Sequence, residues 1–292
     1  MYTESSFARR CMSILKYVAV CGVACFLSAA VSLRVVQIVH LNEVSLQLSA
    51  SRNQIQDLEE QLGKMEQKNT ASPLSGKKIV YDGDSIAQSR ENNGGGYPQL
   101  IADLTGSTYV NFARGGAYLC ASEDRHSVVN NLENLPEDGD LYCFEGGIND
   151  FWNEIPLGEC VPGDYTGVVD PGTVSGAMET IFRYCLEHFP GKPVCFVITH
   201  KIDLTGTRPN DLGDTFLDYR DTMIAVCEKY SIPYYDAYME SGLNGWNETQ
   251  NTLFLNANDR GEADGCHPNE EGYRRYYVPQ LIDLFERMLP GV

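Results

Sequence analysis

The chain of 292 residues has a net charge of -18, and 43% of its residues are hydrophobic. Residues 1–40 hold four basic residues and one acidic residue, a net charge of +3, so the remaining chain carries -21. A surface this acidic repels phosphate backbones, and no basic stripe with interleaved aromatic residues offsets the repulsion. Composition therefore excludes nucleic acid as an expected partner and predicts a folded protein of ordinary hydrophobic content.

An uncharged stretch of 17 residues, 17–33, follows the basic residues Arg9, Arg10 and Lys16. Its length is at the short end for a helix that crosses a membrane. Positive charge before such a helix favours a cytoplasmic N-terminus, which places the rest of the chain outside the cell. We therefore expect residues 1–40 to form a cytoplasmic tail and a single-pass transmembrane signal anchor in the cell membrane.

Residues 41–68 keep a heptad pattern of apolar residues. One seam position holds Leu41, Leu48, Ile55 and Leu62, and the other holds Val44, Leu58 and Met65, with Ser51 as the departure. The pattern predicts a coiled-coil stalk that can join two copies of the chain. An amphipathic helix on the membrane or the domain is the alternative. Because a stalk suits an anchored protein, we favour a retained anchor over signal-peptide cleavage at the small residues 28–30, which would secrete the protein.

Residues 69–77 have the composition of a linker, and we expect a folded domain over residues 78–292. In that domain strand-like runs alternate with helix-like runs. The predicted strands are residues 78–82, 108–112, 141–145, 194–199 and 234–237, and the predicted helices are residues 97–104, 128–132, 174–188, 215–230 and 269–288. This alternation indicates a parallel sheet covered on both faces, with ligands beyond the carboxyl ends of the strands.

The chain has ten cysteines, of which seven lie beyond residue 40. Four are in apolar runs, where buried thiols are expected: Cys143, Cys185, Cys195 and Cys227. Three are in predicted loops and are candidates for a disulfide: Cys120, Cys160 and Cys266. Because no Cys-x-x-Cys spacing occurs, the sequence does not suggest a zinc site.

Three segments at strand ends carry candidate chemistry. Residues 83–86, Gly-Asp-Ser-Ile, follow the first strand, where Ser85 would present its hydroxyl near the N–H groups of a helix start. Residues 111–117 follow the second strand, and their paired glycines allow close approach of the backbone to a ligand. Asn149 follows the third strand, and its amide is a candidate donor to an oxyanion. Each segment alone is typical of an ordinary turn or cap.

A fourth segment, residues 264–269, precedes the last predicted helix, for which Asn269 is a candidate cap. Asp264 and His267 are three residues apart in a turn stiffened by proline. A serine hydroxyl becomes a good nucleophile when a histidine takes its proton and a carboxylate fixes the tautomer of that histidine. Ser85, His267 and Asp264 are the candidates for these three roles.

Taken in order, the four segments resemble the four sequence blocks of the SGNH hydrolase superfamily, also called the GDSL esterase and lipase family. The resemblance covers about residues 78–290. It implies a three-layer α/β/α sandwich, SGNH or flavodoxin-like, with a parallel sheet of about five strands. It also implies that Ser85, His267 and Asp264 form a catalytic triad.

By the same resemblance, the backbone N–H groups of Ser85 and Gly116 and the side chain of Asn149 form the oxyanion hole. The second block departs from the usual pattern of a small or apolar residue followed by serine, because it has Arg114 and Gly115 instead. This departure leaves the choice between Gly115 and Gly116 as donor open.

The resemblance implies a serine esterase that needs no metal or organic cofactor. An extracellular location favours short-chain or O-acetyl esters on extracellular or cell-envelope glycans as substrates. The alternatives are a lipase or phospholipase, an O-acyltransferase on the same scaffold, and a membrane-tethered binding module without turnover. The intact set of Ser85, Asn149, Asp264 and His267 argues against the binding module. The loops at residues 152–173 and 201–214 are expected to border the pocket.

Overall fold

The computed structural model describes residues 72–88, 96–256 and 262–289, together with Met12, Lys16, Tyr17, Cys21, Gly22, Ser28 and Arg34. The chain divides into two compact units, Met1–Thr70 and Ala71–Val292, and the second contains every strand that the structure describes. None of the helices in the described part of the chain is long and apolar enough to cross a membrane. The anchor expected in residues 1–40 lies largely outside the described residues and the coiled coil at 41–68 lies wholly outside them, so both stay predictions.

A parallel sheet forms the centre of the second unit. Its strands are β1 (Lys78–Asp82), β2 (Thr108–Asn111), β3 (Leu141–Gly146), β4 (Val194–Ile198) and β5 (Tyr234–Asp236). They lie in the order β2-β1-β3-β4-β5, and every neighbouring pair is parallel. The chain moves from β1 to β2 in one direction and to β3 in the other, so the order reverses between β1 and β3. Ligands of open α/β sheets bind at such a reversal, beyond the carboxyl ends of the strands.

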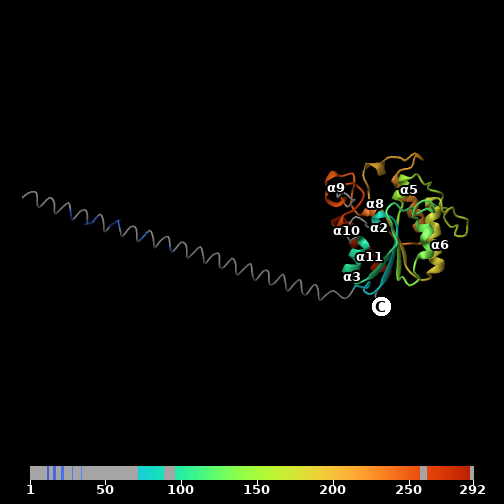
Figure 1. Ribbon diagram of the computed structural model, residues 1–292, viewed down its shortest axis with the longest axis horizontal. Coiled ribbons are helices and arrows are strands. Elements are labelled where there is room, and N and C mark those ends of the chain that lie inside the picture. Colours follow the sequence, from blue (N-terminus) through green and yellow to red (C-terminus); the bar gives the residue numbers. More distant parts are fainter. Residues whose placement is uncertain are drawn as a thin grey trace, which may run out of the picture. The chain divides into compact units, whose positions relative to one another are not determined.

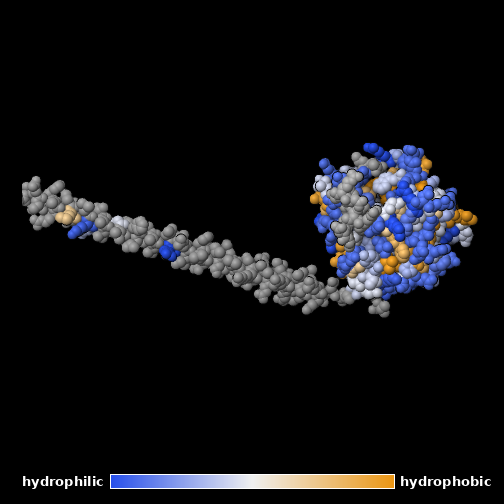
Figure 2. Space-filling model, in the orientation of Figure 1, coloured by the Kyte–Doolittle hydropathy of each residue, from blue (hydrophilic) through white to orange (hydrophobic). Residues whose placement is uncertain are grey.

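Helices cover both faces of the sheet (Figure 1). One layer contains α3 (Tyr97–Thr105), α10 (Glu270–Tyr276) and α11 (Val278–Met288), and the other contains α4 (Val128–Asn131), α6 (Val174–His188) and α7 (Phe216–Tyr230). This arrangement confirms the expected α/β fold with a five-stranded parallel sheet. On the face of the domain seen in Figure 2, hydrophobic residues are scattered among hydrophilic ones.

Short helices gather at the carboxyl ends of the strands. They are α2 (Ser85–Gln88), α5 (Ile148–Trp152) and α8 (Ala237–Glu240), which directly follow β1, β3 and β5, and α9 (Glu248–Phe254), which follows α8. The sequence analysis expected a helix to start at Ser85, without giving its extent, and lacked the other three. The first three are one turn or little more, and α9 has no buried residue, so none has the apolar periodicity by which a helix is recognised. Two 3-10 turns, Leu132–Asn134 and Leu204–Thr207, complete the described elements.

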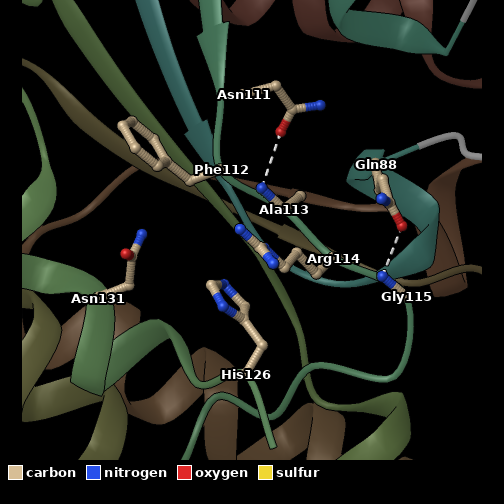
Figure 3. Close-up of a pocket in the computed structure, with 8 residues that line it drawn as sticks. All are labelled: Gln88, Asn111, Phe112, Ala113, Arg114, Gly115, His126 and Asn131. Carbon is tan, nitrogen blue, oxygen red and sulfur yellow. Dashed lines mark hydrogen bonds between the residues drawn. The ribbon is translucent and has the colours of Figure 1, made fainter.

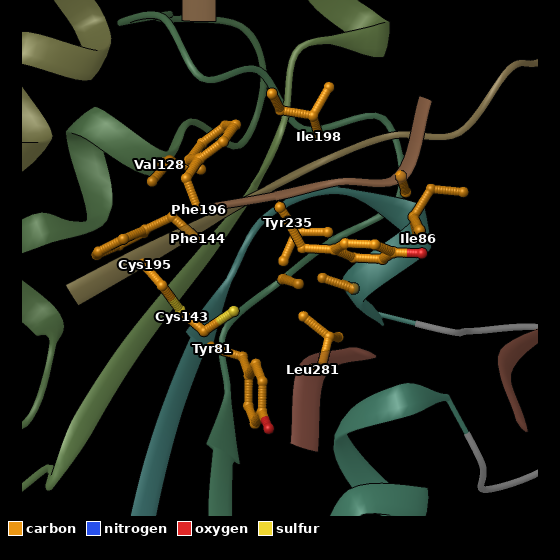
Figure 4. Packing of buried hydrophobic residues seen from close by; sticks show 14 of the residues in the cluster. Tyr81, Ile86, Val128, Cys143, Phe144, Cys195, Phe196, Ile198, Tyr235 and Leu281 are labelled. Carbon is orange, nitrogen blue, oxygen red and sulfur yellow. The ribbon is translucent and has the colours of Figure 1, made fainter. Parts of the chain in front are cut away.

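The core lies on both faces of the central strands (Figure 4). All five residues of β4 and all six of β3 are buried, which explains their continuous apolar character. Cys143 and Cys195 are neighbours across these strands and both are free thiols. The loop cysteines Cys120, Cys160 and Cys266 are also free, so the disulfide considered for them is not formed.

The last helix differs from the prediction of one helix over residues 269–288. It is two helices, α10 and α11, with a break at Tyr277. Pro279 explains the break, because proline lacks the N–H that would continue the helix and its ring displaces the preceding turn. The expected cap is present, since Asn269 Oδ1 accepts the N–H of Gly272 at 2.9 Å.

The folded unit begins before β1. Leu74 is fully buried in the core, and the Ser72 hydroxyl donates to Glu286 Oε1 at 2.7 Å. Residues 72–77 were expected in the linker because their composition is that of a turn. The one large apolar side chain among them, Leu74, ties this turn to the domain.

Candidate active site

The turn between β1 and α2 presents Ser85 at the start of the helix. Glu145, near the end of β3, holds this turn, because its Oε2 accepts the N–H of Asp84 at 3.2 Å and that of Ala87 at 3.3 Å. A Cβ atom at Gly83 would lie 2.6 Å from the backbone oxygen of Glu145, so only glycine fits there. The N–H of Ser85 has no hydrogen-bond partner among the described residues and lies at a helix N-terminus, where negative charge is favoured.

Asp264, His267 and Ser85 form a continuous chain of hydrogen bonds. His267 Nε2 lies 2.8 Å from Ser85 Oγ, and His267 Nδ1 lies 2.7 Å from Asp264 Oδ2. The other carboxylate oxygen of Asp264 accepts the backbone N–H groups of Cys266 and His267, each at 2.9 Å. In this arrangement the imidazole can accept the serine proton at Nε2 while the carboxylate holds the proton at Nδ1.

The surroundings of Asp264 favour its charged form. Burial acts to raise the pKa of this carboxyl, but the hydrogen bonds from the His267 imidazole and from the N–H groups of His267 and Cys266 outweigh burial and lower the pKa. Asp264 is therefore ionised at neutral pH and able to stabilise an imidazolium.

Two donors beside Ser85 come from the loop after β2 and from α5. The N–H of Gly115 donates to Gln88 Oε1 at 2.6 Å, whereas the N–H of Gly116 has no partner in the described part of the chain. Gly116 has a φ of +77°, which suits glycine. Asn149 Nδ2 donates one bond to Asp84 Oδ2 at 3.2 Å, which leaves its second hydrogen for a ligand. Of the two glycines, Gly116 is thus the better candidate donor.

A buried pair of carboxyl groups, Asp84 and Glu145, lies beneath these donors. Burial raises the pKa of both groups, and the nearby Asp84 raises that of Glu145 further. These directions favour one shared negative charge on the pair at neutral pH. Thr199 Oγ1 donates to the other oxygen of Glu145 at 3.0 Å, so the pair is also tied to the residue that follows β4. The sequence prediction gave neither carboxyl a role.

Asp150 connects the two donor segments. Its Oδ2 accepts the N–H of Leu119 at 3.0 Å, and its Oδ1 accepts the N–H of Cys120 at 3.2 Å. Burial raises the pKa of Asp150, although these N–H groups partly offset the effect. Because Asp150 is in α5 next to Asn149, it fixes the loop that carries Gly116 relative to Asn149.

His200, which follows β4, is fully buried and does not border an open site. Its Nδ1 lies 2.6 Å from the hydroxyl oxygen of Tyr277. Burial, with a smaller effect of His267, lowers the pKa of His200 to about 3. His200 is therefore neutral at neutral pH, and it contacts Tyr277 in the interior of the domain.

A small cavity of about 230 Å³ lies beside the turn that carries Asp264. Its lining includes Lys201, Ile202, Asp203, Thr207, Tyr238 and Trp246. A Cβ atom at Gly265 would lie 2.6 Å from the Cβ of Asp203, which shows how closely this loop approaches the acid turn. Part of the loop expected at 201–214 therefore does border the site. Among the described residues, no group of three or more His, Cys, Asp or Glu side chains is placed to hold a metal ion.

The family model described as GDSL-like Lipase/Acylhydrolase matches residues 83–275. The chain belongs to this family. As a member it is an enzyme that hydrolyses esters, which agrees with the sequence prediction. A comparison with curated proteins gives no match.

Solved structures share the fold. One crystal structure is 27% identical, with a TM-score of 0.62, and the match covers 72% of this chain and 96% of that chain. A protein from Lactobacillus plantarum is 23% identical, with a TM-score of 0.60, and the match covers 73% of this chain and 98% of that chain. A possible lipase from Chitinophaga pinensis is 16% identical, with a TM-score of 0.52, and the match covers 72% of this chain and 98% of that chain.

Proposed function

We propose that this family member is a serine esterase that uses Ser85 as nucleophile, His267 as general base and Asp264 as the group that orients the histidine. The observation that supports this assignment is the unbroken hydrogen-bond chain from Asp264 through His267 to Ser85, which joins residues 182 positions apart in the sequence. A carboxylate, an imidazole and a hydroxyl in this order form the constellation that activates serine on unrelated folds.

In the proposed reaction, His267 takes the proton of Ser85 as the hydroxyl oxygen attacks the ester carbonyl. The oxyanion receives hydrogen bonds from the N–H groups of Ser85 and Gly116 and from Asn149, each typically worth about 3 to 4 kcal/mol in the transition state. His267 then protonates the departing alcohol. Water, activated by the same histidine, attacks the acyl ester on Ser85 and releases the acid.

The proposed substrates are short-chain or O-acetyl esters on carbohydrate. The cavity beside the Asp264 turn combines exposed aromatic surface from Trp246, which is 52% exposed, with the polar side chains of Lys201 and Asp203. Apolar ring faces next to polar groups suit the mixed faces of a sugar. If the anchor predicted in residues 1–40 spans the membrane, these esters lie on extracellular or cell-envelope glycans.

The proposal is tested with the full chain, purified in detergent and assayed on 4-nitrophenyl acetate and on an acetylated oligosaccharide. We expect Ser85→Ala to lower kcat/KM by at least about a thousandfold, because a triad loses most of its effect when its nucleophile is removed. Ser75→Ala removes an exposed hydroxyl before β1 and serves as the matched control. Equal rates for the two variants would exclude Ser85 as the nucleophile.

A further inference from the structure

A second cavity, of about 500 Å³, lies at the carboxyl ends of β1 and β2 (Figure 3). We call it the Arg114 pocket, and its lining includes Gln88, Asn111, Arg114, Gly115, His126 and Asn131. Figure 3 shows the side chains of Arg114, His126 and Asn131 extending into the same space. The lining is dominated by polar side chains and the guanidinium of Arg114, which makes it unlike a pocket for a hydrocarbon chain.

The Arg114 pocket adjoins the proposed nucleophile. Gln88, in its lining, is the last residue of the short helix that begins at Ser85, and it accepts the N–H of Gly115 at 2.6 Å. A Cβ atom placed on Gly115 would lie 3.8 Å from the Cβ of Ser85. When the Ser85 hydroxyl oxygen attacks an ester carbonyl, a group attached to the carbonyl carbon therefore lies within reach of this pocket.

The polar groups behind the pocket are already paired with one another. Asp82 is fully buried and accepts Asn131 Nδ2 and the N–H of Gly83, each at 2.8 Å, and His126 Nε2 lies 3.4 Å from it. The amide of Asn111 likewise donates to the backbone oxygen of Ala87 in α2 at 2.8 Å and accepts the N–H of Ala113 at 3.0 Å. These groups form a pre-organised floor of the pocket, in which Asn131 and the N–H of Gly83 donate hydrogen bonds to the carboxylate of Asp82.

Arg114 differs from this floor because it has no carboxylate partner among the described residues. Its backbone is fixed by a hydrogen bond from its N–H to Gly83 O at 2.9 Å, but no ion pair engages its guanidinium. Elsewhere in the domain, Arg183 and Arg220 each pair with a buried carboxylate. In a chain with a net charge of -18, an arginine left without such a partner at the active site is a donor for an external anion.

Arg125 adds a second cation near the glycine segment. Its Nη1 lies 3.9 Å from the position of a Cβ atom on Gly116, and its guanidinium lies 5.2 Å from the centre of the Tyr118 ring. The structure gives it no ion pair with a described carboxylate either. Both guanidinium groups thus border the segment that carries the proposed oxyanion donor, and both favour negative charge there.

We propose that the Arg114 pocket binds a carboxylate or phosphate carried by the substrate, so that the enzyme prefers esters of acidic molecules. Guanidinium groups bind these anions through paired, charge-assisted hydrogen bonds. The anion belongs either to the acyl part or to the alcohol part of the ester. The inference rests on the proposed function, since it assigns a substrate group next to Ser85.

Two matched pairs of esters test the preference. In the first, 4-nitrophenyl hydrogen succinate is compared with 4-nitrophenyl methyl succinate, which places the charge on the acyl part. In the second, 4-acetoxybenzoate is compared with 4-acetoxybenzamide, which places it on the alcohol part. For each pair we take the ratio of kcat/KM for the acid to kcat/KM for its neutral partner, measured with the full chain.

We expect Arg114→Gln to lower this ratio by about tenfold in at least one pair, because one charge-assisted contact is lost. The pair that responds identifies the part of the substrate that bears the anion. Lys192→Gln removes a cation just before β4, at the opposite end of the sheet, and should leave both ratios unchanged. Unchanged ratios in Arg114→Gln for both pairs would overturn the inference.

A binding measurement separates failure of the pocket from failure of the proposed chemistry. In a Ser85→Ala background, calorimetry should show 4-acetoxybenzoate or the hydrogen succinate ester binding more tightly than its neutral partner, and adding Arg114→Gln should abolish the difference. This readout does not require turnover. If the wild-type chain hydrolyses no ester, the triad proposal fails while calorimetry still decides the pocket; if neither acid binds more tightly than its neutral partner, the pocket inference is wrong.

Discussion

The two halves of the active site are held in different ways. The histidine side, residues 264–269, is held by its own turn and by residues close to it in the sequence. Asp264 Oδ1 accepts the N–H groups of Cys266 and His267, and the N–H groups of Gly265 and Asp264 donate to Asn251 Oδ1 and to the backbone oxygen of Leu255. The side chains of Asp264 and His267 are 24% and 20% exposed. The serine side is held from a distance: Glu145 contacts the turn of Ser85 across sequence separations of 61 and 58 residues, and Glu145 is fully buried.

This difference predicts that substitutions on the two sides will change catalysis and stability in different proportions. On the histidine side, a substitution breaks a short, partly exposed set of contacts and should affect the reaction far more than the fold. On the serine side, the same buried groups position the oxyanion donors and also hold β1, β3 and β4 together, so both properties should change. Variants on each side can test whether the two halves really differ in this way.

The largest expected effect is on the histidine side. Asp264→Asn keeps an oxygen that can accept the N–H groups of the turn, but its amide favours the wrong tautomer of His267. We expect kcat to fall by about ten-thousandfold, while the free energy of unfolding changes by less than about 1 kcal/mol. Steady-state kinetics on 4-nitrophenyl acetate and urea unfolding measure the two quantities.

The control for this prediction is Asp138→Asn, which removes an exposed carboxylate that pairs with Lys78 at the other end of β1. It should leave kcat near the wild-type value. If Asp264→Asn is no slower than Asp138→Asn, Asp264 does not act on the histidine. If Asp264→Asn instead unfolds readily, the histidine side is not the locally organised half that the contacts indicate.

The next largest effect concerns the serine side. Asn149→Ala removes a proposed oxyanion donor, so we expect kcat to fall by about 10²- to 10³-fold with a smaller change in KM. Asn153→Ala is the matched control, because Asn153 Nδ2 only donates to the backbone oxygen of Asn149 at 2.8 Å. Similar losses of kcat in the two variants would show that α5 matters as a helix and that the Asn149 amide is not a specific donor.

The same difference explains which residues of the site could be predicted from the sequence alone. The spacing of Asp264 and His267 marks a local turn, and the glycine-flanked Ser85 follows a strand, so the sequence identified the groups that the structure brings together. Glu145 stayed unnoticed because it lies in the apolar run of β3, and its partners are remote in the sequence. No spacing rule connects such residues, and only the register of β1 and β3 brings them into contact.

Some misses had a signal in the sequence. Pro279 marks the break between α10 and α11, but the apolar pattern continues through it and favoured one helix. No signal in the sequence marks Gln88, because its hydrogen bond with the N–H of Gly115 depends on the path of α2. That hydrogen bond occupies the N–H of Gly115 and makes Gly116 the candidate donor, a choice that the sequence left open.

The smallest expected effect is on the pH dependence of stability, and it concerns Glu145, the buried carboxyl of the serine side. Burial, with the Asp84 carboxyl nearby, raises the pKa of Glu145 well above its ordinary value of 4.5. A group whose pKa is raised by folding contributes stability that is fully present below its unfolded pKa and is lost as pH rises through the folded pKa. The wild-type chain should therefore lose unfolding free energy as the pH increases above about 4.5.

Glu145→Gln removes this titration while keeping an oxygen that can accept the N–H groups of Asp84 and Ala87. We expect its unfolding free energy, measured in urea between pH 5 and 8, to fall less with pH than that of the wild type. The difference should be roughly 1.4 kcal/mol for each pH unit in that range by which folding raises the pKa of Glu145. Glu187→Gln, at an exposed position of α6, should retain the wild-type slope. If Glu145→Gln also retains it, Glu145 titrates as a solvated carboxyl, and the serine side is not held by a buried carboxyl pair that retains a proton.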